Sequence, residues 1–124
     1  MNNTNMSPLQ LAELLSDYWS PKIIAEINDS YVKVAKLKGH FVWHRHDQED
    51  EMFIILKGEL TIELYDKQVE LFAGDIYVVP KGVEHNPVAK NECLVMLIEK
   101  KSTQHTGKLI NKNSKSIQQQ LGLV

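Results

Sequence analysis

The chain has 124 residues and a formal net charge of −2, and its 43% hydrophobic and 24% charged residues are typical of a soluble globular protein. Its single cysteine excludes an internal disulfide framework. The sequence has no charged N-terminal segment followed by an apolar stretch and no apolar run of about 18 residues, so neither secretion nor a membrane span is expected. The sequence therefore predicts one cytoplasmic domain that makes no use of a membrane.

A short helix is predicted near the N-terminus. Ser7 suits the N-cap position, Pro8 the first helical position and Gln10 the third, and an apolar stripe continues from there to about Asp17. We expect this helix to pack on the outside of the domain or against a partner subunit. Residues 22–28 follow as a short strand.

The next predicted strand spans residues 31–37. Val32 and Val34 lie on one face of it and Lys33 lies on the other. The alternation fails at the end of this segment, which indicates a sheet edge or a bulge.

Residues 41–46 are predicted to form a strand that carries two histidines. His44 and His46 are two residues apart, so on a strand they project from the same face, while Arg45 points away from it. Two imidazoles side by side on one face form half of a metal site.

Short apolar strands separated by turn residues make up the rest of the body. They are predicted over residues 51–56, 60–64, 69–72, 76–79 and 92–99. Residues 57–59 are expected to form a hairpin turn, and residues 80–83 a rigid turn that delivers His85. This regular spacing indicates an antiparallel sandwich or barrel, and periodicity alone does not choose between the two.

The candidate metal ligands are His44, His46, Glu51 and His85. Three imidazoles and one carboxylate suit zinc, iron, manganese, nickel or copper, and they do not suit calcium or magnesium. The alternative is that the histidines are ordinary core or surface residues and that Glu51 belongs to a solvated charged turn. We favour the metal site, because a carboxylate that begins an apolar strand is costly to bury unless it is paired or bound to a metal. His40 and His105 have no partner at ligand spacing and are left out of the site.

The two segments that hold these residues resemble the two sequence motifs of the cupin superfamily. The first motif reads Gly39, four residues, His44-Arg45-His46, four residues, Glu51, six residues, Gly58. The second reads Gly74, five residues, Pro80-Lys81-Gly82, two residues, His85. The sequence departs from the pattern in having four rather than five residues between Gly39 and His44, and in having Ala89 where the pattern has asparagine. Neither departure affects a proposed ligand.

This resemblance covers residues 31–99 and implies an all-β fold, an antiparallel double-sheet jelly-roll barrel with the site in its mouth. The chain then divides into an N-terminal tail and helix (1–30), the barrel (31–99) and a basic C-terminal tail (100–124) that includes a short helix near residues 114–121. The resemblance also implies a homodimer.

The C-terminal tail carries five lysines and no acidic residue, whereas all 16 acidic residues precede it. A basic tail can bind nucleic acid. No stacking aromatic residues accompany these lysines, so we expect no nucleic-acid partner and favour a solvated segment that docks on the acidic body of its own chain.

Two classes of function follow from the sequence. In the first, the protein is an enzyme that uses one divalent transition metal (zinc, iron, manganese or nickel) with one or two open positions, either as an oxygenase or as an isomerase of a sugar or sugar phosphate. In the second, it is a non-catalytic module that binds or senses a small molecule. Both classes expect a small, partly apolar ligand beside the metal.

Overall fold

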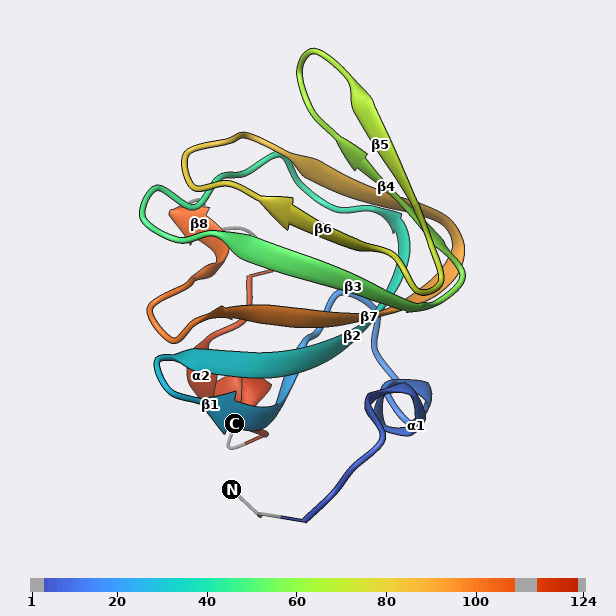
Figure 1. The fold of residues 1–124 in the computed structure, drawn as a ribbon, viewed down its shortest axis with the longest axis vertical. Coiled ribbons are helices and arrows are strands. Elements are labelled where there is room, and N and C mark those ends of the chain that lie inside the picture. The colour runs from blue at the N-terminus through green and yellow to red at the C-terminus, as the bar shows by residue number, and fades with distance from the viewer. Residues whose placement is uncertain (1–3, 109–113, 123–124) are drawn as a thin grey trace.

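The computed structural model describes residues 4–108 and 114–122, and its body is an antiparallel β-barrel with a short helix near each end of the chain (Figure 1). In chain order, the elements are α1 (Pro8–Glu13), β1 (Lys22–Ile27), β2 (Ser30–His40), β3 (Glu51–Lys57), β4 (Glu59–Glu63), β5 (Gln68–Phe72), β6 (Ile76–Val79), β7 (Asn86–Lys100), β8 (His105–Lys108) and α2 (Ile117–Gln120). The predicted all-β jelly-roll barrel with two short terminal helices is confirmed. Helix α1 is shorter than predicted, since it ends at Glu13 rather than near Asp17.

β7 is the strand that joins the two layers of the barrel. Along one edge it pairs with β2, and along the other edge it pairs first with β4 and then with β3. β4 continues into a pair with β5, and β3 into a pair with β6, so the two layers diverge from this single strand (Figure 1). The sequence placed this strand only over residues 92–99, whereas it begins at Asn86, directly after His85.

The hairpin predicted at residues 57–59 is wrong. β3 pairs with β6 and β7, and β4 pairs with β5 and β7, so the chain passes from one layer to the other at Gly58. Gly58 has a φ of 85°, and a Cβ atom added to it would lie 2.8 Å from the carbonyl oxygen of Glu92. The crossing over β7 therefore requires glycine for both its backbone conformation and its lack of a side chain.

Two apolar clusters hold these elements together. The larger one fills the barrel and includes Phe53, Ile55 and Ile62, with exposed fractions of 3%, 1% and 0%. The smaller one lies on the outer face of β2 and β7, where Ala12 of α1 packs with Val34 and Leu94. Cys93 belongs to the larger cluster, as its apolar neighbours in the sequence predicted.

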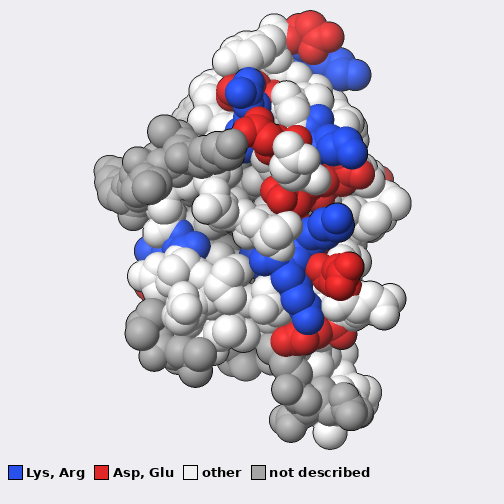
Figure 2. Space-filling model, turned by 90° about the vertical axis from the view of Figure 1, so that its left-hand side faces the viewer, with Lys and Arg blue, Asp and Glu red and all other residues white. Residues whose placement is uncertain are grey.

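The C-terminal tail returns to the body and adds β8 and α2. Lys101 forms an ion pair with Glu26 at 2.9 Å, and the hydroxyl of Ser102 donates a hydrogen bond to Glu49 at 3.0 Å. Basic and acidic side chains are interspersed on the face of the molecule that Figure 2 shows. The remainder of the predicted basic tail, residues 109–113 and 123–124, lies outside the described residues.

Within the part of the chain that the structure describes, neither helix has the length and apolar character needed to cross a membrane.

Candidate metal centre

The four predicted ligands lie at one end of the barrel, on two loops and the first residue of a strand. His44 and His46 belong to the loop between β2 and β3, Glu51 is the first residue of β3, and His85 immediately precedes β7. The strand predicted over residues 41–46 is wrong. β2 already ends at His40, and in the loop only His44 forms a bridge, with His85.

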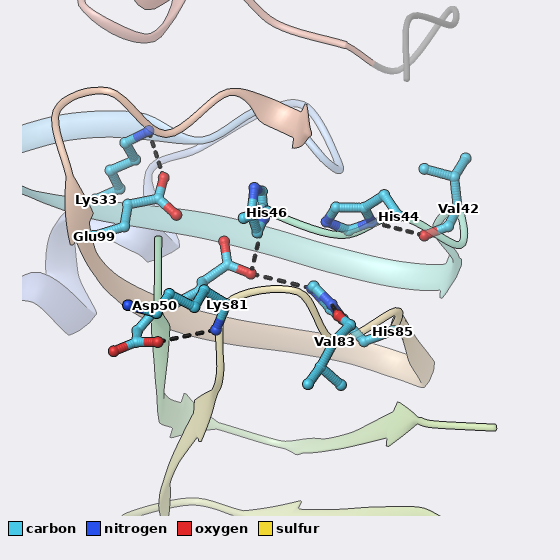
Figure 3. A network of polar contacts seen from close by, with 10 residues as sticks. Lys33, Val42, His44, His46, Asp50, Lys81, Val83, His85 and Glu99 are labelled. Carbon is cyan, nitrogen blue, oxygen red and sulfur yellow. Dashed lines mark hydrogen bonds and ion pairs between the residues drawn. The ribbon is translucent and has the colours of Figure 1, made fainter. Parts of the chain in front are cut away.

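Backbone hydrogen bonds clamp the two loops together. The amides of His44 and His85 each donate to the other residue's carbonyl oxygen, at 3.0 and 2.9 Å. The amide of Gly82 donates to the carbonyl of His46 at 2.8 Å, and that of Lys81 donates to the Asp50 carboxylate at 2.9 Å (Figure 3). The two motifs are thereby held in fixed register, which places the ligand side chains without help from a regular strand.

The four side chains converge on one point. One ligand atom from each of His44, His46, Glu51 and His85 lies within 4.8 Å of the corresponding atoms of the other three, and all four residues are buried. Figure 3 shows the side chains of His44, His46 and His85 on the two facing loops. Bonds of about 2.1 Å to a central ion are within reach of such a cluster after small side-chain rotations.

For two of the histidines, the hydrogen-bond partners show which ring nitrogen carries the proton. Nδ1 of His44 and Nδ1 of His85 each lie 2.9 Å from a backbone carbonyl oxygen, that of Val42 and that of Val83. A carbonyl oxygen only accepts, so each Nδ1 carries the proton and donates it. In a neutral imidazole the lone pair is then on Nε2, which is the atom that faces the other ligands.

A carboxylate oxygen also points to this centre. Oε1 of Glu51 lies 3.3 Å from Nε2 of His85 and 3.5 Å from Nε2 of His46. Two acceptors at this distance repel each other unless a cation lies between them or a proton joins them. Both nitrogens of the buried His46 ring also have no hydrogen-bond partner among the described residues. Unpartnered ligand atoms of this kind are what a metal ion satisfies, so the donor set fits a transition metal.

The electrostatics of the cluster favour metal-binding protonation states. Burial, assisted by the neighbouring His85, lowers the pKa of His44 from 6.5 to about 4, which keeps its imidazole neutral near pH 7. Burial alone would raise the pKa of Glu51, but its contacts with His46 and His85 outweigh burial and hold that pKa well below 4.5. The site therefore presents a neutral His44 and an ionised carboxylate.

A buried ion pair behind Glu51 is missed by the sequence analysis. Glu99 pairs with Glu51 across β3 and β7, and Lys33 of β2 reaches Glu99 at 2.6 Å, with side-chain exposed fractions of 1% for Lys33 and 3% for Glu99 (Figure 3). Burial and the charge of Glu51 raise the pKa of Glu99 well above its usual range. The alternation around Lys33 was predicted, but nothing in the sequence indicated that the face carrying the lysine lies inside the barrel.

Beside the ligands is a small cavity of about 30 Å³ with mostly apolar walls. The cavity is lined by His44, Glu51 and His105 and by Trp19, Pro21, Ala35, Leu37, Phe41, Phe53, Pro87, Val95 and Leu97. His105, which the sequence analysis left out, comes from β8 in the C-terminal tail. No ligand-type spacing marks it, because only the return of the tail brings it here.

Arg45 lies on the surface, as predicted, and its guanidinium Nε donates a hydrogen bond to Asp47 at 2.8 Å. Its backbone meets the tail instead. Gly107 of β8 packs so closely on the carbonyl of Arg45 that a Cβ atom on Gly107 would overlap it. β8 accordingly covers the His44–His46 segment (Figure 1).

Comparison with known proteins agrees with this architecture. The sequence pattern of the Cupin domain family matches residues 31–99. The uncharacterized protein YdbB of Bacillus subtilis (strain 168) is 35% identical over 82 residues, which are 65% of this chain and 73% of that protein.

Two crystal structures are similar over most of the chain. A cupin-2 domain containing protein from Shewanella frigidimarina is 46% identical, with a TM-score of 0.75, and the match covers 77% of this chain and 94% of that one. Protein NMB1881 from Neisseria meningitidis is 28% identical, with a TM-score of 0.72 and coverage of 78% and 99%. From the two motifs, the barrel and these matches, we conclude that the chain belongs to the Cupin domain family.

Proposed function

We propose that His44, His46, Glu51 and His85 hold one divalent transition metal that leaves open positions for a small-molecule ligand. The observation that carries this proposal is the convergence of four buried side chains of ligand type, one atom of each lying within 4.8 Å of the corresponding atoms of the other three. A metal ion at this point would be within reach of all four side chains.

The number of ligands bears on which metal fits. Four protein ligands complete the tetrahedron that zinc adopts in structural sites. An ion that prefers six ligands, such as iron, manganese or nickel, keeps two positions free beside the same four side chains. An open position is what allows a metal to polarise a bound ligand or activate a bound water.

The cavity favours an apolar ligand over a phosphorylated one. Among its described lining residues there is no lysine or arginine, so nothing there supplies the cationic contacts that a sugar phosphate needs. Its aromatic walls include Phe41, Phe53 and Trp19. Of the enzyme classes considered, an oxygenase of a small apolar substrate fits this cavity better than a sugar-phosphate isomerase.

The alternative is a protein that binds or senses a small ligand without turning it over. The same cavity and metal ligands can serve this role, because binding a ligand requires no general base. The two are distinguished by incubating the metal-loaded protein with candidate substrates and measuring turnover alongside binding.

We also propose that the protein is a cytoplasmic homodimer. The outer face of β6 leaves Ile76 61% and Val78 41% exposed, and apolar side chains of this kind favour association with a second copy. Light scattering at micromolar concentration is expected to give the mass of a dimer, and a monomer mass contradicts the proposal.

Metal analysis is the experiment that tests the proposed centre. Untagged protein purified without chelators, or loaded with each candidate ion, is expected to contain close to one metal per chain. His44→Ala and His85→Ala are expected to lose the metal and keep the fold as judged by circular dichroism. His40→Ala is the control, because His40 is exposed and lies outside the cluster. Unchanged metal content in both ligand variants would refute the site.

A further inference from the structure

His105 is a polar residue in the cavity that the proposed metal ligands do not use. It begins β8, beyond the residues 31–99 that match the family pattern, and it lines the same cavity as His44 and Glu51. The Phe41 ring packs against both histidines, with its centroid 5.5 Å from that of His44 and 5.0 Å from that of His105.

The protonation of His105 follows from its backbone partner. The amide of Lys115 donates a hydrogen bond to Nδ1 of His105 at 3.0 Å, so Nδ1 must offer its lone pair. The proton of the neutral ring is then on Nε2. Burial lowers the pKa of His105 to about 3, so the ring is neutral at pH 7 and keeps this arrangement.

A structural role in holding the tail uses only one of the two ring nitrogens of His105. The hydrogen bond from the amide of Lys115 uses Nδ1 alone, and Nε2–H is the second polar group of a ring that lines the cavity. The rest of the wall is apolar apart from the metal ligands themselves. A hydrogen-bond donor placed among apolar side chains beside a metal is how a binding site orients a small ligand.

We propose that Nε2–H of His105 donates a hydrogen bond to the ligand whose other end occupies the metal's open position. The ligand class is a short molecule or anion that binds the metal at one end and carries a hydrogen-bond acceptor at the other, with no other polar group between the two ends. A cavity of about 30 Å³ has room for only one or two water-sized groups, so the part that enters is small. The stacked rings of Trp19 and Phe41, 4.7 Å apart, form a firm wall beside it. This inference rests on the proposed metal centre.

The test uses azide as the probe and cobalt(II) as a coloured metal. Asparagine at position 105 places an amide oxygen near the position of Nδ1, so His105→Asn keeps an acceptor for Lys115 and removes the donor at the position of Nε2. Glutamine reaches further, so His105→Gln keeps a donor near the position of Nε2. Wild type and both variants are loaded with cobalt(II), and azide is titrated while the visible absorption of the metal is followed.

We expect His105→Asn to weaken azide binding about tenfold, with cobalt content and fold unchanged, because one hydrogen bond to an anion is lost. His105→Gln is expected to stay within about threefold of wild type. Equal azide affinity in wild type and His105→Asn, at equal cobalt content, overturns the inference.

A measurement on the unmutated protein covers the case in which His105→Asn does not fold. With diamagnetic cadmium(II) in the site, an ion that accepts more than four ligands, the Nε2–H resonance of His105 is expected to shift downfield when azide is added, and an unmoved resonance overturns the inference. The two proposals also fail differently. If wild type takes up no cobalt or cadmium, the metal centre itself is refuted, and the role of His105 falls with it. If the metal binds and the azide affinity does not depend on His105, only the role of His105 is refuted.

Discussion

The metal-free protein is expected to lose stability in acid because the partly buried ring of His105 is held neutral. Its pKa is about 3 in the folded protein, against 6.5 for an unperturbed histidine. Between these values the unfolded chain binds more protons than the folded one, so stability rises with pH across this window. The stabilisation is fully present above pH 6.5 and is lost as the pH falls towards 3.

The size of the loss follows from the two pKa values. Between pH 7.5 and pH 5.0, protonation of His105 in the unfolded chain lowers the free energy of unfolding by about 2 kcal/mol. His44, with a pKa of about 4, adds a similar amount when no metal is bound. The measurement is urea unfolding of chelator-treated protein at both pH values, followed by tryptophan fluorescence.

Replacing His105 isolates its contribution to the loss of free energy of unfolding in acid. His105→Asn is expected to lose about 2 kcal/mol less than wild type between the two pH values, because asparagine does not titrate. His40→Asn is the matched control, since His40 is exposed and its solvent surroundings change little on unfolding. If wild type and His105→Asn lose equal stability in acid, the ring is not held neutral by burial and the reasoning is refuted.

Three further predictions concern packing and charge. Lys33→Met is expected to lower the free energy of unfolding by about 3 kcal/mol in urea unfolding at pH 7, because Glu99 and the nearby Glu51 lose their buried cation. Adding Glu99→Gln to the same chain is expected to restore part of this free energy, and equal stability of the single and double variants would contradict this account. Gly107→Ala is expected to lower both the melting temperature and the zinc affinity measured by calorimetry, because the added methyl group overlaps the carbonyl of Arg45. Gly122 also has a positive φ, but a Cβ atom there meets open space, so Gly122→Ala is the control and is expected to leave zinc affinity unchanged. Ile62→Ala is expected to cost about 2–5 kcal/mol in urea unfolding, because its side chain is fully buried, and a loss no larger than that of a truncation at exposed Ile76 would contradict the described core.

The sequence could predict those parts of the molecule that depend on local spacing. The alternation of apolar and polar residues located the strands of the body, and the motif spacing of His44, His46, Glu51 and His85 named the residues that the structure brings within 4.8 Å. Alternation does not tell which face of a strand is the inner one, and the structure shows that Tyr77 and Val79 of β6 lie on it.

Local spacing could not predict which strands and loops far apart in the sequence pair with one another. A hairpin at Gly58 was predicted because glycine between two strands usually marks a tight turn, yet the chain there crosses between layers, since both neighbouring strands pair with β7. His44 and His46 were placed on a strand because their spacing suits one, whereas backbone hydrogen bonds to residues 82 and 85 hold them in a loop. Those partners lie some 40 residues away along the chain, and no local pattern contains them.

The same physical effect gives His44 and His105 opposite uses. Burial lowers the pKa of both rings and keeps them neutral, and a neutral imidazole has one donor and one acceptor. Nδ1 of His44 donates to the carbonyl of Val42, which leaves Nε2 as a lone pair for a metal. Nδ1 of His105 accepts from the amide of Lys115, which leaves Nε2 as a donor for a ligand. Which nitrogen carries the proton is thus decided by one backbone group in each case, so the tail that supplies the amide of Lys115 takes part in defining the chemistry of the cavity.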